Sequence, residues 1–140
     1  MTVLVGMNFY DCRGAAARRQ ARAIHAMRRL HDALCVNVQW VNERFDVEGI
    51  ATLPCLQRDA RTVTGRPGPR KPILPDILDA LAEAATRQGC THALYANADI
   101  ELSPAVIGHI AATARANCYI VVAPDRDRIA AGEFVPTLPR

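Results

Sequence analysis

Short apolar runs alternate with amphipathic helical patterns along most of this chain, and this alternation restricts the folds that it can adopt. The first run, Val3–Met7, is continuously apolar, as expected for a strand buried on both faces of a sheet. A helix is predicted from Gly14 to Leu34, and the alternating residues 36–41 then predict a half-covered strand. Strands that alternate with helices form βαβ units. The chain is therefore predicted to be a three-layer α/β/α sandwich with a mostly parallel, Rossmann-like sheet.

The remaining patterns predict about five strands and three helices in all. The further elements are a strand at 50–53 that Pro54 ends, a basic loop at 57–71, a helix that starts near Pro72 or Pro75 and stops at Gly89, a strand at 92–96, a helix opened by Ser103 and Pro104, and a last strand at 119–123. Leu74, Ile77, Leu78, Leu81 and Ala85 are expected to form the apolar face of the second helix, and Val106, Ile107, Ile110 and Ala114 that of the third. The basic loop is either a flexible linker or a lid that closes over a ligand.

Length and composition favour one soluble domain. The chain has 140 residues, of which 50% are hydrophobic, which suffices for one core. No apolar run is long enough to span a bilayer, and the N-terminus lacks the basic segment of a secretory signal. We therefore expect a cytoplasmic protein. The five cysteines show no CxxC spacing, so reduced thiols are expected rather than disulfides.

Charge is distributed unevenly along the chain. Residues 1–71 contain 12 basic and 6 acidic side chains, whereas residues 72–140 contain 5 basic and 8 acidic ones. Lys71 is the single lysine, so nearly all the cations are arginines, which suit bidentate phosphate contacts. A genomic coding preference explains such a bias equally well. The net charge of +3 is too small to indicate nucleic-acid binding, which stays a weaker alternative for the arginine-rich half.

Polar segments follow three of the predicted strands, at 8–11, 97–101 and 125–127. In open α/β sheets, ligands bind at the carboxyl ends of the strands near a topological switch point. Carboxylates at that edge suit Mg²⁺ or Mn²⁺, whose coordination a diphosphate completes. Two other interpretations remain open, because Asp99 also suits a turn, and because Asp125 and Asp127 flank Arg126 as in a surface ion pair.

Several of these motifs together resemble the N-terminal half of a GT-A-type glycosyltransferase, a nucleotide-diphospho-sugar transferase. They are the apolar strand that ends in Asn8, the basic loop that leads into Lys71, and the strand end Ala-Leu-Tyr-Ala-Asn-Ala-Asp-Ile at 93–100. The resemblance covers about residues 2–127. It implies a nucleotide-sugar-binding domain at 1–127 and a C-terminal tail at 128–140.

The resemblance also implies roles for individual residues. Asp99 would contact a divalent cation (Mn²⁺ or Mg²⁺) or the diphosphate, because Asn97-Ala98-Asp99 stands where the family usually has Asp-x-Asp. Asn8, Phe9 and Tyr10 would lie against the base and ribose, and Lys71, with Arg66 or Arg70, would approach the phosphates. Asn97 replaces the first carboxylate, so it could instead hydrogen-bond a ribose or sugar hydroxyl.

Two functions are therefore predicted. The first is a glycosyltransferase-like protein that binds a nucleotide-diphospho-sugar and transfers its sugar. The second is a non-catalytic α/β binding module that acts by self-association or by pairing with another chain. The second arises because members of the family normally continue beyond the fifth strand, where the acceptor pocket and the catalytic base are found. A homodimer is expected in that case, since sheet surface would need to be covered.

Overall fold

Four parallel strands form the central layer of the fold. The computed structural model describes residues 3–113 of the chain. The strands are β1 (Val3–Met7), β2 (Ala33–Trp40), β3 (Ala51–Leu56) and β4 (His92–Tyr95), in the order β3-β2-β1-β4. The helices are α1 (Gly14–Arg28), α2 (Ala60–Thr64), α3 (Leu74–Arg87) and α4 (Pro104–Thr113). All strand pairs are parallel, as the alternation of strands and helices predicts.

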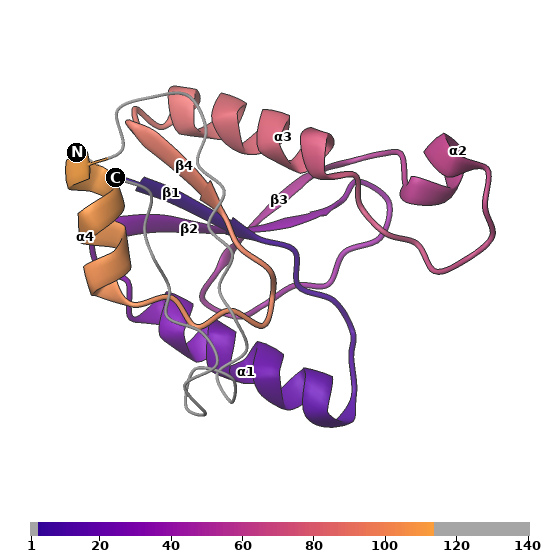
Figure 1. Ribbon diagram of the computed structural model, residues 1–140, viewed down its shortest axis with the longest axis horizontal. Helices are drawn as coiled ribbons and strands as arrows, with labels where there is room; N and C mark the ends of the chain where they lie inside the picture. Colours follow the sequence, from indigo (N-terminus) through magenta and orange to yellow (C-terminus); the bar gives the residue numbers. More distant parts are fainter. Residues whose placement is uncertain (1–2, 114–140) are drawn as a thin grey trace, which may run out of the picture.

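Helices cover both faces of this sheet (Figure 1). Helix α3 lies on one face, where Leu4 of β1 packs with Ile77 and Leu81. Helices α1 and α4 lie on the other face, where Val3 and Val5 of β1 belong to one core with Met27 and Ile107. Successive residues of a strand point to opposite faces, so one apolar strand serves both cores. The predicted three-layer α/β/α sandwich is therefore confirmed.

The strand count within the described residues is four rather than five. The predicted fifth strand at 119–123 lies outside residues 3–113, as does the predicted boundary between a domain at 1–127 and a tail at 128–140. Within residues 3–113, no helix is both long enough and apolar enough to cross a bilayer.

Helix α1 is shorter than its periodicity predicts. It ends at Arg28, whereas the spacing of apolar residues extends the pattern to Leu34. Leu34 instead belongs to β2, where it pairs with Leu4 of β1 and its side chain is exposed. The prediction for residues 29–34 is wrong because pairing with a neighbouring strand overrode the local helical pattern.

Strand β3 continues through Pro54 to Leu56, so the prediction that Pro54 ends it is also wrong. Among the described strands β3 lies at the edge of the sheet, where a residue without an N–H is tolerated. The register shifts at this point, because Gln39 pairs with Pro54 and the next residue, Trp40, pairs with Leu56. The irregularity accommodates the proline without ending the strand.

The prolines predict the starts of α3 and α4 well, but not every apolar residue of these helices is buried. Pro75 lies in the first turn of α3, and Gly89 follows the helix with a φ of +69°. Leu74, Leu78 and Val106 were expected on the buried faces and are exposed instead. Ile77, Leu81 and Ile107 carry the contacts with the sheet.

Candidate functional site

The carboxyl ends of β1 and β4 define the topological switch point of the sheet. From β1 the chain continues to β2 and β3 on one side, and it then crosses to β4 on the other side. The two ends stay together beyond the strands, because the Ala96 amide donates to the Gly6 carbonyl at 3.1 Å. Ligands of open α/β sheets bind in the crevice at such a point.

Three of the predicted site residues are exposed at this switch point. Tyr10, which follows β1, has 51% of its surface exposed. Asn97 and Asp99 follow β4 and are also exposed. The amide of Ile100 donates to the carbonyl of Asn97 at 3.0 Å, so Asp99 lies within a tight turn. The turn interpretation of Asp99 is therefore correct, and it is compatible with a role in binding.

The two residues before Tyr10 face inward. Phe9 is 1% exposed and packs in the core between the sheet and α1. Its ring is buried and not available to a nucleotide, so the expectation for Phe9 is corrected: Phe9 is a core residue just after β1. The Asn8 side chain donates through Nδ2 to the Val38 carbonyl at 2.7 Å, which ties the loop after β1 to β2.

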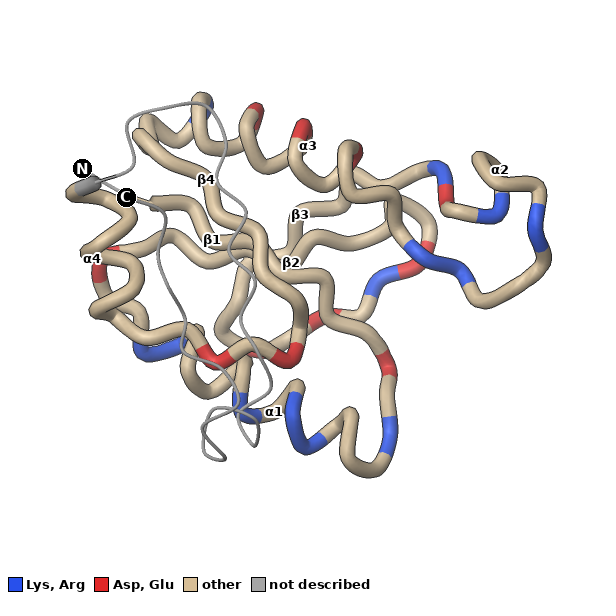
Figure 2. The backbone as a smooth tube through the Cα atoms, viewed as in Figure 1, with Lys and Arg blue, Asp and Glu red and all other residues tan. Residues whose placement is uncertain are grey.

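Asp99 forms an ion pair with Arg19 of α1. The Nε atom of Arg19 lies 4.0 Å from the Oδ2 atom of Asp99, and about half of each side chain is exposed. Figure 2 shows basic positions of α1 beside acidic positions of the segment between β4 and α4. Burial raises the pKa of Tyr95 at the end of β4, and the charge of Asp99 adds to that rise.

An open hollow lies between the C-terminal half of α1 and the segment that leads into α4. Its volume is about 720 Å³, and it lies between α1 and residues 101–104. It is lined by basic and small side chains of α1 and by residues just after Asp99, among them Arg22, His25, Arg29 and Glu101. Arg22 is one helical turn from Arg19, and from there the hollow extends along α1 to His31, away from the switch point.

Buried amide side chains hold the loop after β1, and sequence reasoning missed them. Gln20 of α1 is 5% exposed. Its Oε1 accepts from the amide of Tyr10 at 3.2 Å, and its Nε2 donates to the carbonyl of Tyr10 at 2.9 Å. This pairing satisfies both backbone groups of Tyr10 as a neighbouring strand would. It fixes α1 relative to the switch point.

Asn37 and Gln39 of β2 extend this network beneath the loops. Gln39 Nε2 donates to the Phe9 carbonyl at 2.6 Å and to Asn37 Oδ1 at 2.7 Å, and Gln39 Oε1 accepts from the Phe45 amide at 2.9 Å. Asn37 Nδ2 donates to the Phe45 carbonyl at 2.7 Å. Both side chains are at most 2% exposed. The prediction of a half-covered strand is therefore wrong for this part of β2, because the loop after β2 folds over its polar face.

The predicted basic loop leaves the fold at Asp59 and returns to it at Pro72, and backbone contacts hold its two ends together. We call residues 59–72 the excursion. Residues Asp59 and Pro72 form an isolated antiparallel bridge, and the amide of Ala60 donates to the carbonyl of Lys71 at 2.9 Å. The short helix α2 lies inside it, and its outer residues 61–69 are exposed. Figure 1 shows that α2 projects away from the sheet.

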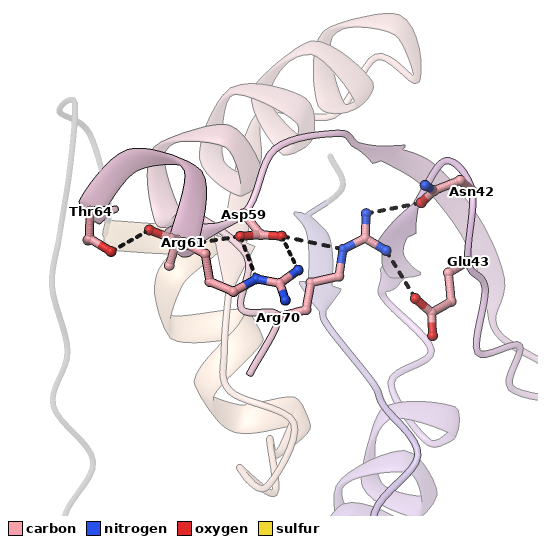
Figure 3. Close-up of polar contacts among 7 residues, drawn as sticks. Asn42, Glu43, Asp59, Arg61, Thr64 and Arg70 are labelled. Atoms are coloured by element: carbon pink, nitrogen blue, oxygen red, sulfur yellow. Dashed lines mark hydrogen bonds and ion pairs between the residues drawn. The ribbon is translucent and has the colours of Figure 1, made fainter. Parts of the chain in front are cut away.

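Asp59 and Arg70 connect the excursion to the ends of β2 and β3 (Figure 3). Asp59 accepts from the backbone amide of Arg61 and from its guanidinium, both at 2.8 Å, and Arg70 Nε is 3.8 Å from its Oδ2. Arg70 also donates to Glu43 and to Asn42, at 3.0 Å each, and its guanidinium carbon lies 3.9 Å from the ring centre of Trp40. The guanidinium of Arg70 is therefore bound to other residues of the chain, and these contacts hold the excursion in place.

The predicted site residues thus fall into two groups. Tyr10, Asn97 and Asp99 lie at the switch point, with Asn8 and Phe9 beneath them. Arg66, Arg70 and Lys71 belong to the excursion after β3, where Arg66 and Lys71 are exposed and Arg70 binds Glu43, Asn42 and Asp59. Within residues 3–113, the hydrogen bonds and ion pairs of the excursion do not extend to Asp99, so a shared phosphate site stays a prediction.

The side chains at the switch point do not make a good binding site for a divalent cation. Within the described residues, no group of three or more His, Cys, Asp and Glu side chains is arranged to hold a metal ion. Asp99 faces the guanidinium of Arg19, and Asn97 brings no charge. Hard cations prefer several anionic oxygens. Asp125 and Asp127, which were expected at the same edge, lie outside residues 3–113.

Burial makes Cys12 and Cys35 poor nucleophiles. Cys12, Cys35, Cys55 and Cys90 are free. Burial raises the pKa of Cys35 to about 11, and burial and the charge of Asp11 raise that of Cys12. A thiol with a raised pKa is mostly protonated near neutral pH and therefore reacts slowly. Cys118 lies outside the described residues.

The attachment of the excursion is expected to depend on pH through Asp59. Hydrogen bonds from the Arg61 side chain, and secondarily from its amide, lower the pKa of Asp59 to about 2 against the opposing effect of burial. Because the pKa is lower in the folded state, the stabilisation is complete above the ordinary pKa of about 4 and is lost as the pH falls through about 2. Trp40, the single tryptophan, touches Arg70 and reports the change by fluorescence.

In the wild-type protein we expect the fluorescence of Trp40 to change between pH 4 and pH 2. Asp59→Asn should show the altered fluorescence already at pH 7 and lose that transition. Asp32→Asn, at an exposed position, serves as the control and should behave like the wild type. An unaltered acid transition in Asp59→Asn would contradict the assignment.

Comparison of the chain with protein-family models, with curated proteins and with solved structures gave no match.

Proposed function

We propose that this chain is a nucleoside-diphospho-sugar-binding domain, as its resemblance to GT-A-type glycosyltransferases implies. One observation supports this most strongly: exposed polar and charged side chains, those of Tyr10, Arg19, Asn97 and Asp99, lie at the switch point of a parallel sheet. This is the position at which open α/β sheets bind nucleotides. A ligand with a flat base, a charged diphosphate and a hydroxylated sugar matches the chemistry available there.

Each part of such a ligand has a candidate partner. The Tyr10 ring is exposed on a loop whose backbone Gln20 fixes, and an aromatic face suits stacking with a base. Arg19 and Arg22 offer guanidinium groups to the diphosphate. Asn97 offers an amide to a ribose or sugar hydroxyl. Sugar transfer is a separate property, measured by release of nucleoside diphosphate from whichever donor binds.

The experiment is a thermal-shift screen of UDP-, GDP- and dTDP-sugars, followed by calorimetry of any compound that stabilises the protein. We expect at least one of them to raise the unfolding temperature. Tyr10→Ala should weaken its binding by about tenfold, since stacking of a base on an aromatic ring is worth about 1–3 kcal/mol. Leu78→Ala is the matched control, because Leu78 is a similarly exposed apolar residue of α3, and its affinity should stay unchanged.

Absence of stabilisation by every compound, with a folded wild-type protein, would contradict the proposal. Equal loss of affinity in Tyr10→Ala and Leu78→Ala would contradict the assigned location. Sedimentation of the same samples tests the alternative binding module, which predicts concentration-dependent self-association without a nucleotide.

A further inference from the structure

We infer that Arg19 supplies the positive charge that a divalent cation would otherwise bring to this site, so that a nucleoside diphosphate binds without a metal ion. The inference rests on the proposed function and concerns how the same site recognises the diphosphate. It assigns a binding role to a residue of α1 that lies outside the short motif at 97–99.

The acidic side chain at the switch point already has a cationic partner. Asp99 Oδ2 lies 4.0 Å from Arg19 Nε, and the neighbouring Asn97 is neutral. A divalent cation bound to Asp99 would therefore stand within a few ångströms of a permanent guanidinium charge, and the two would repel each other. No other arrangement of three acidic, histidine or cysteine side chains within residues 3–113 offers a metal site instead.

Arg19 lies near the loops that follow both strands of the switch point. Its contact with Asp99 places it beside the loop after β4. It also lies close to the loop after β1, because its charge opposes the rise in the pKa of Cys12 that burial and Asp11 cause. The next residue, Gln20, bonds both backbone groups of Tyr10. The backbone from which Arg19 projects is therefore held in place before any ligand arrives.

A guanidinium suits a diphosphate better than a diffuse basic surface does. Its planar fork donates two parallel hydrogen bonds to phosphate oxygens and keeps its charge at every physiological pH. About half of the Arg19 side chain is exposed and therefore accessible. Asp99 is not expected to contact the phosphates, since its carboxylate would repel them.

The test is calorimetric titration of the full chain with UDP, GDP and dTDP, in buffer with EDTA and in buffer with MnCl₂. We expect the same affinity in both buffers. Arg19→Gln should weaken binding at least tenfold, Arg19→Lys should retain part of the affinity, and Asp99→Asn should bind as tightly as the wild type or more tightly. Arg18→Gln is the matched control, because Arg18 is an exposed neighbour on α1, and its affinity should stay within twofold.

The outcomes separate this inference from the proposed function. Binding that requires Mn²⁺, disappears in Asp99→Asn and persists in Arg19→Gln would overturn the inference and leave the proposed function intact. Equal weakening by Arg19→Gln and Arg18→Gln would also overturn it, since only general charge would then matter. Failure of the folded wild type to bind any of the three nucleotides in either buffer would overturn both.

Discussion

Replacing Gln39 with leucine is expected to lower the free energy of unfolding by about 3 kcal/mol, because it leaves several buried polar groups without partners. The Phe9 carbonyl and the Phe45 amide would each lose a hydrogen bond, and Asn37 Oδ1 would lose one of its two donors. Gln39 is 2% exposed, so water cannot replace these contacts without opening the fold. Leucine keeps a similar volume, so the effect measures the lost polar contacts rather than a cavity.

Urea denaturation measures this effect, with circular dichroism and the fluorescence of Trp40 as two independent probes. Gln57→Leu is the control, since Gln57 is exposed just after β3, and it should change the stability by less than about 0.5 kcal/mol. Equal stabilities of the two variants would show that the amide network contributes nothing. Because the network also carries the loop with Tyr10, Gln39→Leu should weaken nucleotide binding as well.

Replacing Gly6 with alanine is expected to destabilise the protein by about 2–3 kcal/mol through overpacking. A Cβ atom at Gly6 would lie 2.7 Å from Cδ1 and 3.1 Å from Cγ of Leu81. Leu81 is 1% exposed and packs among Leu4, Val38 and Ile77, so its side chain has no free space to enter. The glycine is therefore required because α3 approaches β1 closely, and not because of its backbone conformation.

A double-mutant cycle tests this explanation. In the Leu81→Ala background the steric conflict is gone, so Gly6→Ala should be neutral or stabilising there. Gly108→Ala is the control, because within residues 3–113 no atom beyond the helix's own backbone and the adjoining residues lies within 4 Å of a Cβ at that position. It should stabilise the protein by about 0.5–1 kcal/mol, as alanine does in a helix interior. A full destabilisation by Gly6→Ala in the Leu81→Ala background would contradict the steric explanation.

Local patterns in the sequence predict those strands and helices whose formation depends on residues close together in the chain. The apolar run of β1 and the strand β4 follow from composition over a few residues, and Pro75 and Gly89 mark the limits of α3 because they restrict the backbone directly. The parallel three-layer architecture follows from the order of these elements. Tyr10, Asn97 and Asp99 were predicted at one edge because parallel strands end together.

Partners that lie far apart in the chain were decided only by the folded structure. Asn37 and Gln39 look like the open face of a strand until the loop at 41–50 covers them. From the sequence Arg70 is predicted to bind phosphate, but in the folded chain it contacts Trp40 and Asp59. Arg19 is a candidate site residue only because folding brings it to Asp99, which is 80 positions away in sequence. The backbone conformation of a residue depends mainly on the residue itself and on its near neighbours in sequence, so local patterns predict it. The partner of a polar side chain is set by which distant segments the hydrophobic cores bring together, and no local pattern encodes that choice.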